Sequence, residues 1–241
     1  MVQYHRPSGG AFAFFLLVLA ACCSAGVCAA PEIDSQSVMQ GVDRSVAYRD
    51  DQLLSYTVTE HYTVFRNDDN AHPAAEMTVK TTYAKNVGKS YQIVSESGPA
   101  LLQKEVLGRA LENEKTLNEP ANRAQELITS ANYEMTVEGE QALDGRDCFL
   151  VAITPRRISP FLFKGKIWVD AANEDIARLN GVAAKSASVL TGPAQLERRY
   201  GEVDGLPMAT HASATVSSWL LGPTRVEIEY SNYAITRRPG K

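Results

Sequence analysis

Residues that could do chemistry are few and widely spaced in this chain of 241 residues. Histidine, the usual proton acceptor near neutral pH, occurs after residue 30 only as His61, His72 and His211, with no spacing that places two on one helical face. Glu227 and Glu229 alternate with apolar residues, which predicts that both lie on the solvent face of a strand. Neither a nucleophile elbow nor a phosphate-binding loop occurs. The sequence therefore predicts a protein that is not an enzyme and uses no metal or cofactor.

The four cysteines divide between the N-terminal segment and one position in the rest of the chain. Cys22, Cys23 and Cys28 lie within residues 1–30, and Cys148 lies inside a continuous apolar run. A free cysteine in such a run usually packs as a small buried hydrophobe, so we expect Cys148 to be buried rather than nucleophilic. If residues 1–30 are removed by cleavage, no disulfide can form.

Residues 1–30 have the pattern of an export signal. Arg6 precedes an apolar run that starts at Ala11 and ends in small residues before Pro31. Two processing sites overlap there and both stay open. A lipobox-like sequence would make Cys22 an acylated N-terminus that anchors the chain to a membrane facing the periplasm, whereas ordinary cleavage next to Pro31 would release a free periplasmic protein.

The remaining residues, 31–241, are enough for one all-β domain with a sizeable core. The chain carries a formal net charge of −4 at pH 7, and its only basic cluster is Arg237, Arg238 and Lys241 at the C-terminus. A mildly acidic chain without a basic face is a poor partner for nucleic acid. We therefore predict a single domain that does not bind nucleic acid.

Alternation of apolar and polar residues with a period of two recurs along most of the domain and predicts antiparallel strands. Asp144-Gly145, Asp204-Gly205 and Gly222-Pro223 separate neighbouring segments by a few residues, as in hairpins. The predicted strands cover residues 56–64, 77–83, 91–93, 133–138, 148–154, 165–170, 178–184, 196–202, 208–220 and 224–233.

One helical pattern interrupts the strands. Apolar residues at spacings of three and four follow Gly98-Pro99, which indicates an amphipathic helical segment over residues 98–117. A second short helix is predicted over residues 123–129, after Pro120. A sheet of about ten strands must curl to hide its apolar face. The predicted fold is therefore mainly β (α+β), a strongly curved antiparallel sheet that forms an unclosed barrel with a helical lid or plug.

Four motifs resemble the outer-membrane lipoprotein-sorting protein superfamily. They are KGKIWVDA at 164–171, IARLNG at 176–181, RYGEVDGLPM at 199–208 and VEIEYSNY at 226–233. The resemblance covers most of residues 50–236. It implies a half-open barrel, like that of bacterial periplasmic lipoprotein carriers, whose concave apolar face holds acyl chains.

The candidate site residues follow from this arrangement. The helical segment would cover the concave face through Leu102, Val106, Leu107 and Leu111. Residues 98–129 would swing away to admit an acyl chain, with the backbone change at Gly98, Gly108 and Pro120. Phe161, Leu162 and Phe163 are either an exposed apolar rim loop or the first residues of the next strand. The alternative for the interior is a barrel filled by its own side chains. The candidate lining residues on the strands are Tyr56, Val58, Tyr62, Val64, Met77, Val79 and Tyr83.

Two functions remain open. The first is a non-enzymatic cell-envelope protein that binds acyl chains of lipids or lipoproteins, as carrier or receptor in outer-membrane lipoprotein sorting. The alternative is an interaction or sensor module that presents the barrel rim or a sheet edge to a partner protein. In either case we expect membrane association only if Cys22 is acylated.

Overall fold

A computed structural model of the chain describes residues 34–159, 161–186, 192–218 and 222–239. Residues Ile33–Lys241 form one compact unit. The predicted export signal, residues 1–30, and the predicted acylation site Cys22 lie outside the described residues.

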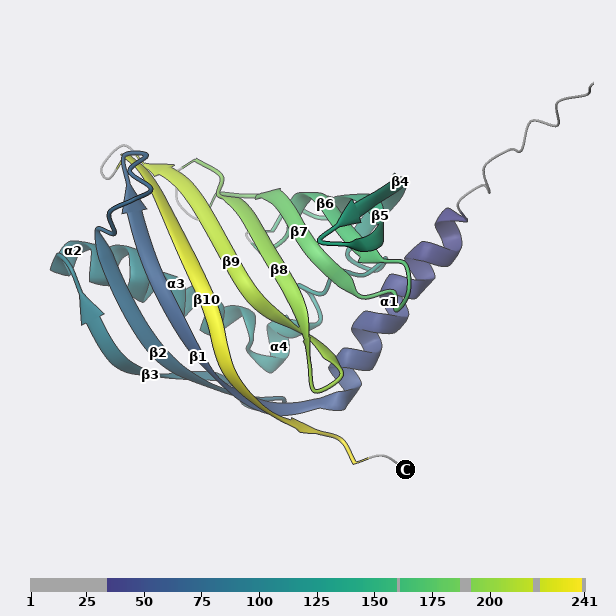
Figure 1. Cartoon of the computed structure of the whole chain (residues 1–241), viewed down its shortest axis with the longest axis horizontal. Coiled ribbons are helices and arrows are strands. Elements are labelled where there is room, and N and C mark those ends of the chain that lie inside the picture. Colours follow the sequence, from purple (N-terminus) through teal and green to yellow (C-terminus); the bar gives the residue numbers. More distant parts are fainter. Residues whose placement is uncertain (1–33, 160, 187–191, 219–221, 240–241) are drawn as a thin grey trace, which may run out of the picture. The chain divides into compact units, whose positions relative to one another are not determined.

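A single antiparallel sheet of ten strands forms the body of this unit, in the order β3-β2-β1-β10-β9-β8-β7-β6-β5-β4 (Figure 1). The sequence alternation produces these strands because every second side chain points to the same face. The strands are β1 (Leu53–Arg66), β2 (Ala75–Ala84), β3 (Gly88–Ser97), β4 (Tyr133–Leu143), β5 (Arg146–Pro155), β6 (Phe163–Asp170), β7 (Ile176–Ala183), β8 (Gln195–Val203), β9 (Leu206–Ser218) and β10 (Gly222–Arg237).

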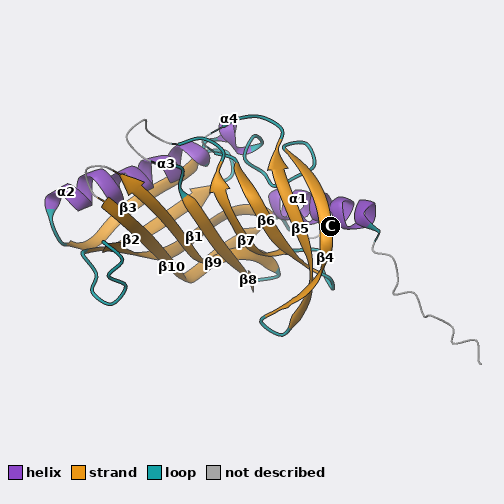
Figure 2. Cartoon of the chain, turned by 90° about the horizontal axis from the view of Figure 1, so that it is seen from above, coloured by secondary structure: helices purple, strands orange, loops and turns teal. Residues whose placement is uncertain are grey.

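The sheet is strongly curved and does not close, because β3 and β4 are its two edges (Figure 2). All neighbours along the chain pair as hairpins except β3 and β4, and the first strand pairs with the last, with Tyr62 opposite Ile228. The predicted unclosed, curved antiparallel sheet is therefore confirmed.

Within the described residues, five helical elements accompany the sheet: α1 (Ser35–Gln52), α2 (Ala100–Leu102), the π-helical η1 (Gln103–Gly108), α3 (Arg109–Leu117) and α4 (Pro120–Arg123). Elements α2, η1 and α3 follow each other without a break, so we refer to them together as the helical segment 100–117. The predicted lid helix over residues 98–117 is thus present and runs along one side of the sheet (Figure 2).

Helix α1 was not predicted from the sequence. Its first turn is capped by Asp34, whose Oδ1 accepts a hydrogen bond from the backbone N–H of Gln36 at 3.1 Å. Its apolar side is a narrow stripe of valines at a spacing of four, and Val38 and Val42 are buried. Most of its other side chains are polar, so its hydrophobic periodicity is weak.

The second short helix was predicted over residues 123–129, and this range is wrong. Helix α4 covers Pro120–Arg123 instead, with the proline in the first turn, where its missing N–H is not needed. The amide of Asn132 then donates to the carbonyls of Ala124 and Leu127 at 3.0 and 2.8 Å. These bonds hold the chain after Ala124 in turns rather than in a continuing helix.

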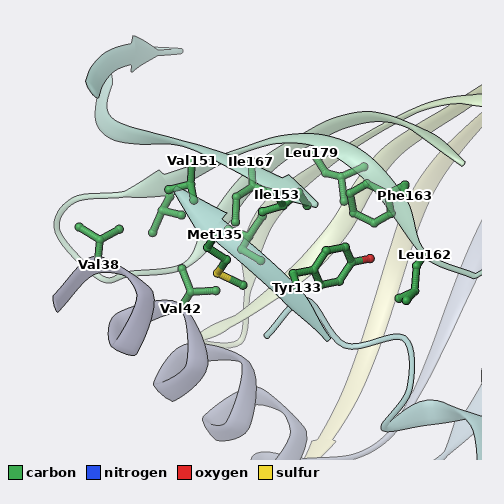
Figure 3. Close-up of a cluster of buried hydrophobic side chains, with 12 residues drawn as sticks. Val38, Val42, Tyr133, Met135, Val151, Ile153, Leu162, Phe163, Ile167 and Leu179 are labelled. Carbon is green, nitrogen blue, oxygen red and sulfur yellow. The ribbon is translucent and has the colours of Figure 1, made fainter. Parts of the chain in front are cut away.

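The inward-facing side chains form three apolar clusters. The first lies between α1 and strands β4 to β7, where Val42 of α1 faces Met135 of β4 (Figure 3). The second lies between the helical segment 100–117 and strands β1, β2, β9 and β10. The third joins β1 and β2 to Leu206 and Met208 at the start of β9. Helices therefore cover the concave face at both ends of the sheet.

Candidate functional site

All seven predicted lining residues on β1 and β2 lie on the concave face and are at most 9% exposed. The structure divides them between two clusters. Tyr62, Val64, Met77 and Val79 belong to the cluster beneath the helical segment 100–117. Tyr56, Val58 and Tyr83 belong to the cluster with Leu206 and Met208, and the rings of Tyr56 and Tyr83 stack with centroids 5.0 Å apart.

The predicted lid residues contact the predicted lining residues. Leu102, Leu107 and Leu111 are buried in the same cluster as Tyr62 and its neighbours, and Val106 packs at the margin of that cluster. The helical segment thus lays an apolar stripe on the concave face. Whether these residues contact a ligand stays a prediction.

The segment Phe161-Leu162-Phe163 leads into strand β6, and its last two residues are not exposed. Leu162 and Phe163 are buried in the cluster beneath α1, and the Phe163 ring lies 5.6 Å from that of Tyr133. Phe163 is the first residue of β6, whereas Phe161 is partly exposed just before it. The exposed-loop interpretation is therefore wrong for Leu162 and Phe163, because their apolar side chains complete the core.

Of the hollows along the described part of the sheet, the two best formed are not bordered by the seven lining residues of β1 and β2. The larger, about 500 Å³, lies between α1 and β4 and is lined by residues such as Met39, Ser130 and Arg156. The smaller, about 160 Å³, includes Asp170, Asp175 and Tyr200 in its lining. Beneath the helical segment the protein's own side chains pack together, as in the filled-barrel alternative.

Charged residues on the concave face were missed by the sequence analysis. Glu60 is only 1% exposed although it is a glutamate within a strand. A signal was present, because Glu60 is in phase with the buried Val58 and Tyr62. Lys89 of β3 is likewise in phase with Tyr91, and Arg198 of β8 with Leu196.

Three of the missed side chains form a buried ion trio. The carboxylate of Glu114 on α3 accepts from Lys89 Nζ at 2.7 Å through Oε2 and from Arg198 Nη2 at 3.1 Å through Oε1. The side chain of Lys89 is 7% exposed and that of Glu114 is 16% exposed, while Arg198 is half-buried. Four strands separate β3 from β8 in the sheet, so this single carboxylate joins opposite sides of the concave face.

Electrostatics keep the trio ionised. Burial alone would raise the pKa of Glu114, but the positive charges of Lys89 and Arg198 outweigh burial and lower this pKa to about 2. Burial opposes the charge of Lys89 too, and the attraction of Glu114 outweighs it, so the pKa of Lys89 lies well above its ordinary value. At neutral pH the trio therefore carries two positive charges and one negative charge.

Several polar groups near the trio have incomplete hydrogen bonding. The hydroxyl of Tyr62 donates to Glu60 Oε2 at 2.6 Å. Within the described part of the chain, no partner is found for Glu60 Oε1 or for the hydroxyls of Tyr83, Tyr91 and Thr81. Buried polar groups without hydrogen-bond partners are uncommon in proteins. Their presence here indicates that stability of the fold alone does not explain why these residues are polar.

The carboxyl group of Glu126 also lies close to the trio. Burial, followed by repulsion from Glu114, raises the pKa of Glu126 to about 8. Glu126 is therefore mostly protonated and uncharged at neutral pH.

The cysteine and histidine side chains have ordinary surroundings. Cys148 is buried with a free thiol, as predicted, and burial raises its pKa, which disfavours the reactive thiolate. His211 Nδ1 lies 2.7 Å from Glu229 Oε1, and His61 Nδ1 lies 3.1 Å from Thr78 Oγ1. Within the described ranges we find no group of three or more side chains that could hold a metal ion. No helix there is long and apolar enough to span a membrane.

Comparison with known proteins gives matches only among solved structures, since no family model and no curated protein matches the sequence. A LolA superfamily protein from Nitrosomonas europaea is 11% identical, with 86% of this chain and 96% of that chain covered and a TM-score of 0.44. An outer-membrane lipoprotein-sorting protein domain from Vibrio parahaemolyticus is 14% identical, covers 80% and 90%, and has a TM-score of 0.45. A DUF1329 family protein from Desulfovibrio piger is 14% identical, covers 83% and 92%, and has a TM-score of 0.44.

Two of these structures carry names from the superfamily that the sequence motifs resemble. Identities of 11–14% and TM-scores of 0.44–0.45 assign neither a family nor a function to this chain. The functional argument therefore rests on the residues of the concave face.

Proposed function

We propose that this chain is a non-enzymatic cell-envelope protein that binds acyl chains of lipids or lipoproteins between the concave face of the sheet and the helical segment 100–117. One observation carries the proposal. An open sheet has its apolar inner face covered by a separate helical segment, and the contact consists of Leu102, Leu107 and Leu111 packed on residues such as Tyr62 and Met77. An acyl chain has the same chemistry as these leucine side chains.

The energies favour such an exchange. Withdrawing three buried leucine side chains costs roughly 5–9 kcal/mol, at about 1.5–3 kcal/mol each. A long acyl chain of about 15 methylenes gains up to about 12 kcal/mol when buried, at roughly 0.8 kcal/mol for each methylene. A bound acyl chain can therefore compensate for withdrawing these three apolar side chains.

We expect the segment to bend at glycine and proline residues at its ends and at its π-helical junction. Gly98 joins β3 to the segment with φ at +102°, a conformation that other residues rarely adopt. Gly108 lies at the junction of the π-helical η1 and α3, and π-helical turns often occur at functional sites. Pro120 begins α4 on the far side. These are the three positions at which the sequence predicts bending.

The proposed cellular role rests on the sequence. The predicted export signal in residues 1–30 and the four motifs support a role in the bacterial periplasm, as carrier or receptor in outer-membrane lipoprotein sorting. Acylation of Cys22 would make the protein a membrane-anchored receptor, and cleavage near Pro31 would make it a free carrier.

A photoactivatable fatty acid tests the proposal. After irradiation of the purified mature protein, mass spectrometry of proteolytic peptides should find the label on residues 56–64, 77–83 or 100–111. Excess unlabelled fatty acid should abolish the labelling. Label confined to outward-facing residues such as Ile158 and Val182, or no competable label, would contradict acyl-chain binding on the concave face.

One observation favours the alternative function, in which a sheet edge binds a partner protein. The open edge strand β3 exposes Ile93 by 50% and Val94 by 63%, and Leu101 at the start of the helical segment is 51% exposed. Exposed apolar residues on an unpaired edge are suited to contact with another chain. A Val94→Lys substitution should abolish capture of an envelope partner, while fatty-acid labelling of the concave face stays unchanged.

A further inference from the structure

We propose that Lys89 and Arg198 form the binding site for the anionic group of an amphiphile, and that the carboxylate of Glu114 occupies this site when the helical segment is closed. The inference deepens the proposed function and rests on it. It adds a ligand class, namely acyl chains that end in a carboxylate or a phosphate.

The first argument is the geometry of the trio. Each oxygen of the Glu114 carboxylate contacts one cation, with Lys89 on Oε2 at 2.7 Å and Arg198 on Oε1 at 3.1 Å. A fatty-acid carboxylate has the same two oxygens, and a phosphate ester offers a similar pair. Lys89 and Arg198 come from strands of the sheet, so they would stay in place when α3 moves away.

The second argument is the environment of the two cations. Lys89 is buried, and Arg198 is half-buried on the same concave face. Moving Glu114 away would leave two positive charges side by side without their shared anion, which is strongly unfavourable in a poorly solvated site. Opening of the helical segment is therefore favoured by a ligand that brings its own anion.

The third argument is the order of residues along the helical segment. Leu107, Leu111 and Glu114 follow at spacings of four and three, so they share one face, and all three point at the sheet. Along this face of the helix, an apolar stripe is followed by a carboxylate. A fatty acid has the same sequence of groups, with an apolar chain that ends in a carboxylate.

Neighbouring groups fit an anion as well. Tyr91 is in phase with Lys89 on β3, and its hydroxyl, which lacks a partner in the described part of the chain, could donate to the ligand. Glu60 is a nearby carboxylate that attracts Lys89 and accepts a hydrogen bond from the hydroxyl of Tyr62, so it offsets at most one of the two positive charges. Glu126 carries little negative charge at neutral pH, because burial raises its pKa to about 8. The remaining charges do not cancel those of the two cations.

The test compares palmitate with palmityl alcohol, which has the same chain without a charge, by displacement of a fluorescent fatty acid from the delipidated mature protein. We expect palmitate to bind at least about tenfold more tightly than the alcohol, since a charge-assisted contact is worth at least a factor of this size. Lys89→Gln and Arg198→Gln should each remove this preference, and binding of the alcohol should not become weaker, since each substitution also loosens the contact that keeps the segment closed. Lys80→Gln, on the exposed face of β2, is the matched control and should keep it.

Two further arms sharpen the result. Glu114→Gln should increase palmitate affinity about tenfold, because the competing carboxylate is lost while the shape of the side chain is kept. Inorganic phosphate alone should not displace the probe below millimolar concentration, and a free anion that displaces it there would overturn the requirement for an amphiphile.

The outcomes separate this inference from the proposed function. Equal binding of palmitate and its alcohol to the unmodified protein would overturn the anion site and leave acyl-chain binding intact. Binding of neither would contradict the proposed function itself. Because this comparison uses the unmodified protein, it decides the question even if Lys89→Gln or Arg198→Gln fails to fold.

Discussion

The two helix-covered ends of the concave face differ in what lies beneath the helix. Under α1 the core is apolar except for the buried hydroxyl of Tyr133, and Val38 and Val42 pack on residues such as Met135 and Ile167. Under the helical segment 100–117 an apolar stripe is combined with the ion trio and with tyrosine hydroxyls that lack partners in the described part of the chain. We call these the α1 region and the 100–117 region.

The two helices are also held differently. Polar contacts also hold α1 in place. Arg44 forms an ion pair with Glu174 at 2.6 Å, and the hydroxyl of Ser45 donates to Asp175 at 2.5 Å. The carboxylate of Asp43 accepts from the backbone N–H of Ser130 at 2.8 Å. Both ion pairs described between the helical segment and the sheet use the single residue Glu114. This difference supports our proposal of a permanent core under α1 and an exchangeable cover over the rest of the face.

The largest expected effect comes from removing the anion of the trio. Glu114→Ala should lower the free energy of unfolding by about 3–5 kcal/mol, because it leaves two cations without a partner in a poorly solvated site. Urea denaturation of the ligand-free protein measures the loss, and palmitate should restore part of it. Glu112→Ala, at an exposed position of the same helix, is the matched control. Equal effects of the two substitutions would remove the special role of the trio.

Apolar substitutions should separate the two regions. Ile167→Ala in the α1 region and Leu107→Ala in the 100–117 region should each cost about 2–5 kcal/mol of stability, since both side chains are fully buried. Only Leu107→Ala should strengthen acyl-chain binding, because it weakens the closed state alone. Thermal denaturation and probe displacement on both variants check this. A similar gain in affinity for Ile167→Ala would mean that the α1 region opens too.

A pH effect should arise from the 100–117 region. Burial and Glu114 raise the pKa of Glu126 from its ordinary 4.5 to about 8. Between these values the folded protein keeps a proton that the unfolded chain releases, so the free energy of unfolding should fall as the pH rises. We expect a decrease on the order of 1 kcal/mol, because solvent screens a partly exposed group. Urea midpoints from pH 5 to 8 measure it, and Glu126→Gln should flatten the profile.

The smallest effect is expected on the outer face. His211 and Glu229 pair at 2.7 Å, but Glu229 is largely exposed. His211→Ala should change stability by about 0.5 kcal/mol or less and leave ligand binding unchanged. A stability loss several times larger in the same denaturation assay would show that the outer face contributes to stability as much as the concave face does.

Strand positions and the open sheet were predictable from the sequence because alternation along β1 and β2 is nearly perfect. Helix α1 was not, because its buried stripe of Val38 and Val42 is too narrow to stand out among polar residues. The apolar part of the candidate site followed from the same alternation. The charged part of the site was not predictable in this way, because a charged residue in a strand predicts the solvent face. Burial of Arg198 becomes favourable through its contact with Glu114, which lies on a helix distant in sequence.

The central claim is that the helical segment 100–117 opens independently of the rest of the protein. Hydrogen–deuterium exchange followed by mass spectrometry tests it directly, because local opening and global unfolding exchange amides at different rates. The account predicts that amides of 100–117 exchange much faster than those of α1, residues 35–52, and that palmitate changes only the former. Equal, slow exchange of both segments, unaffected by palmitate, would contradict it.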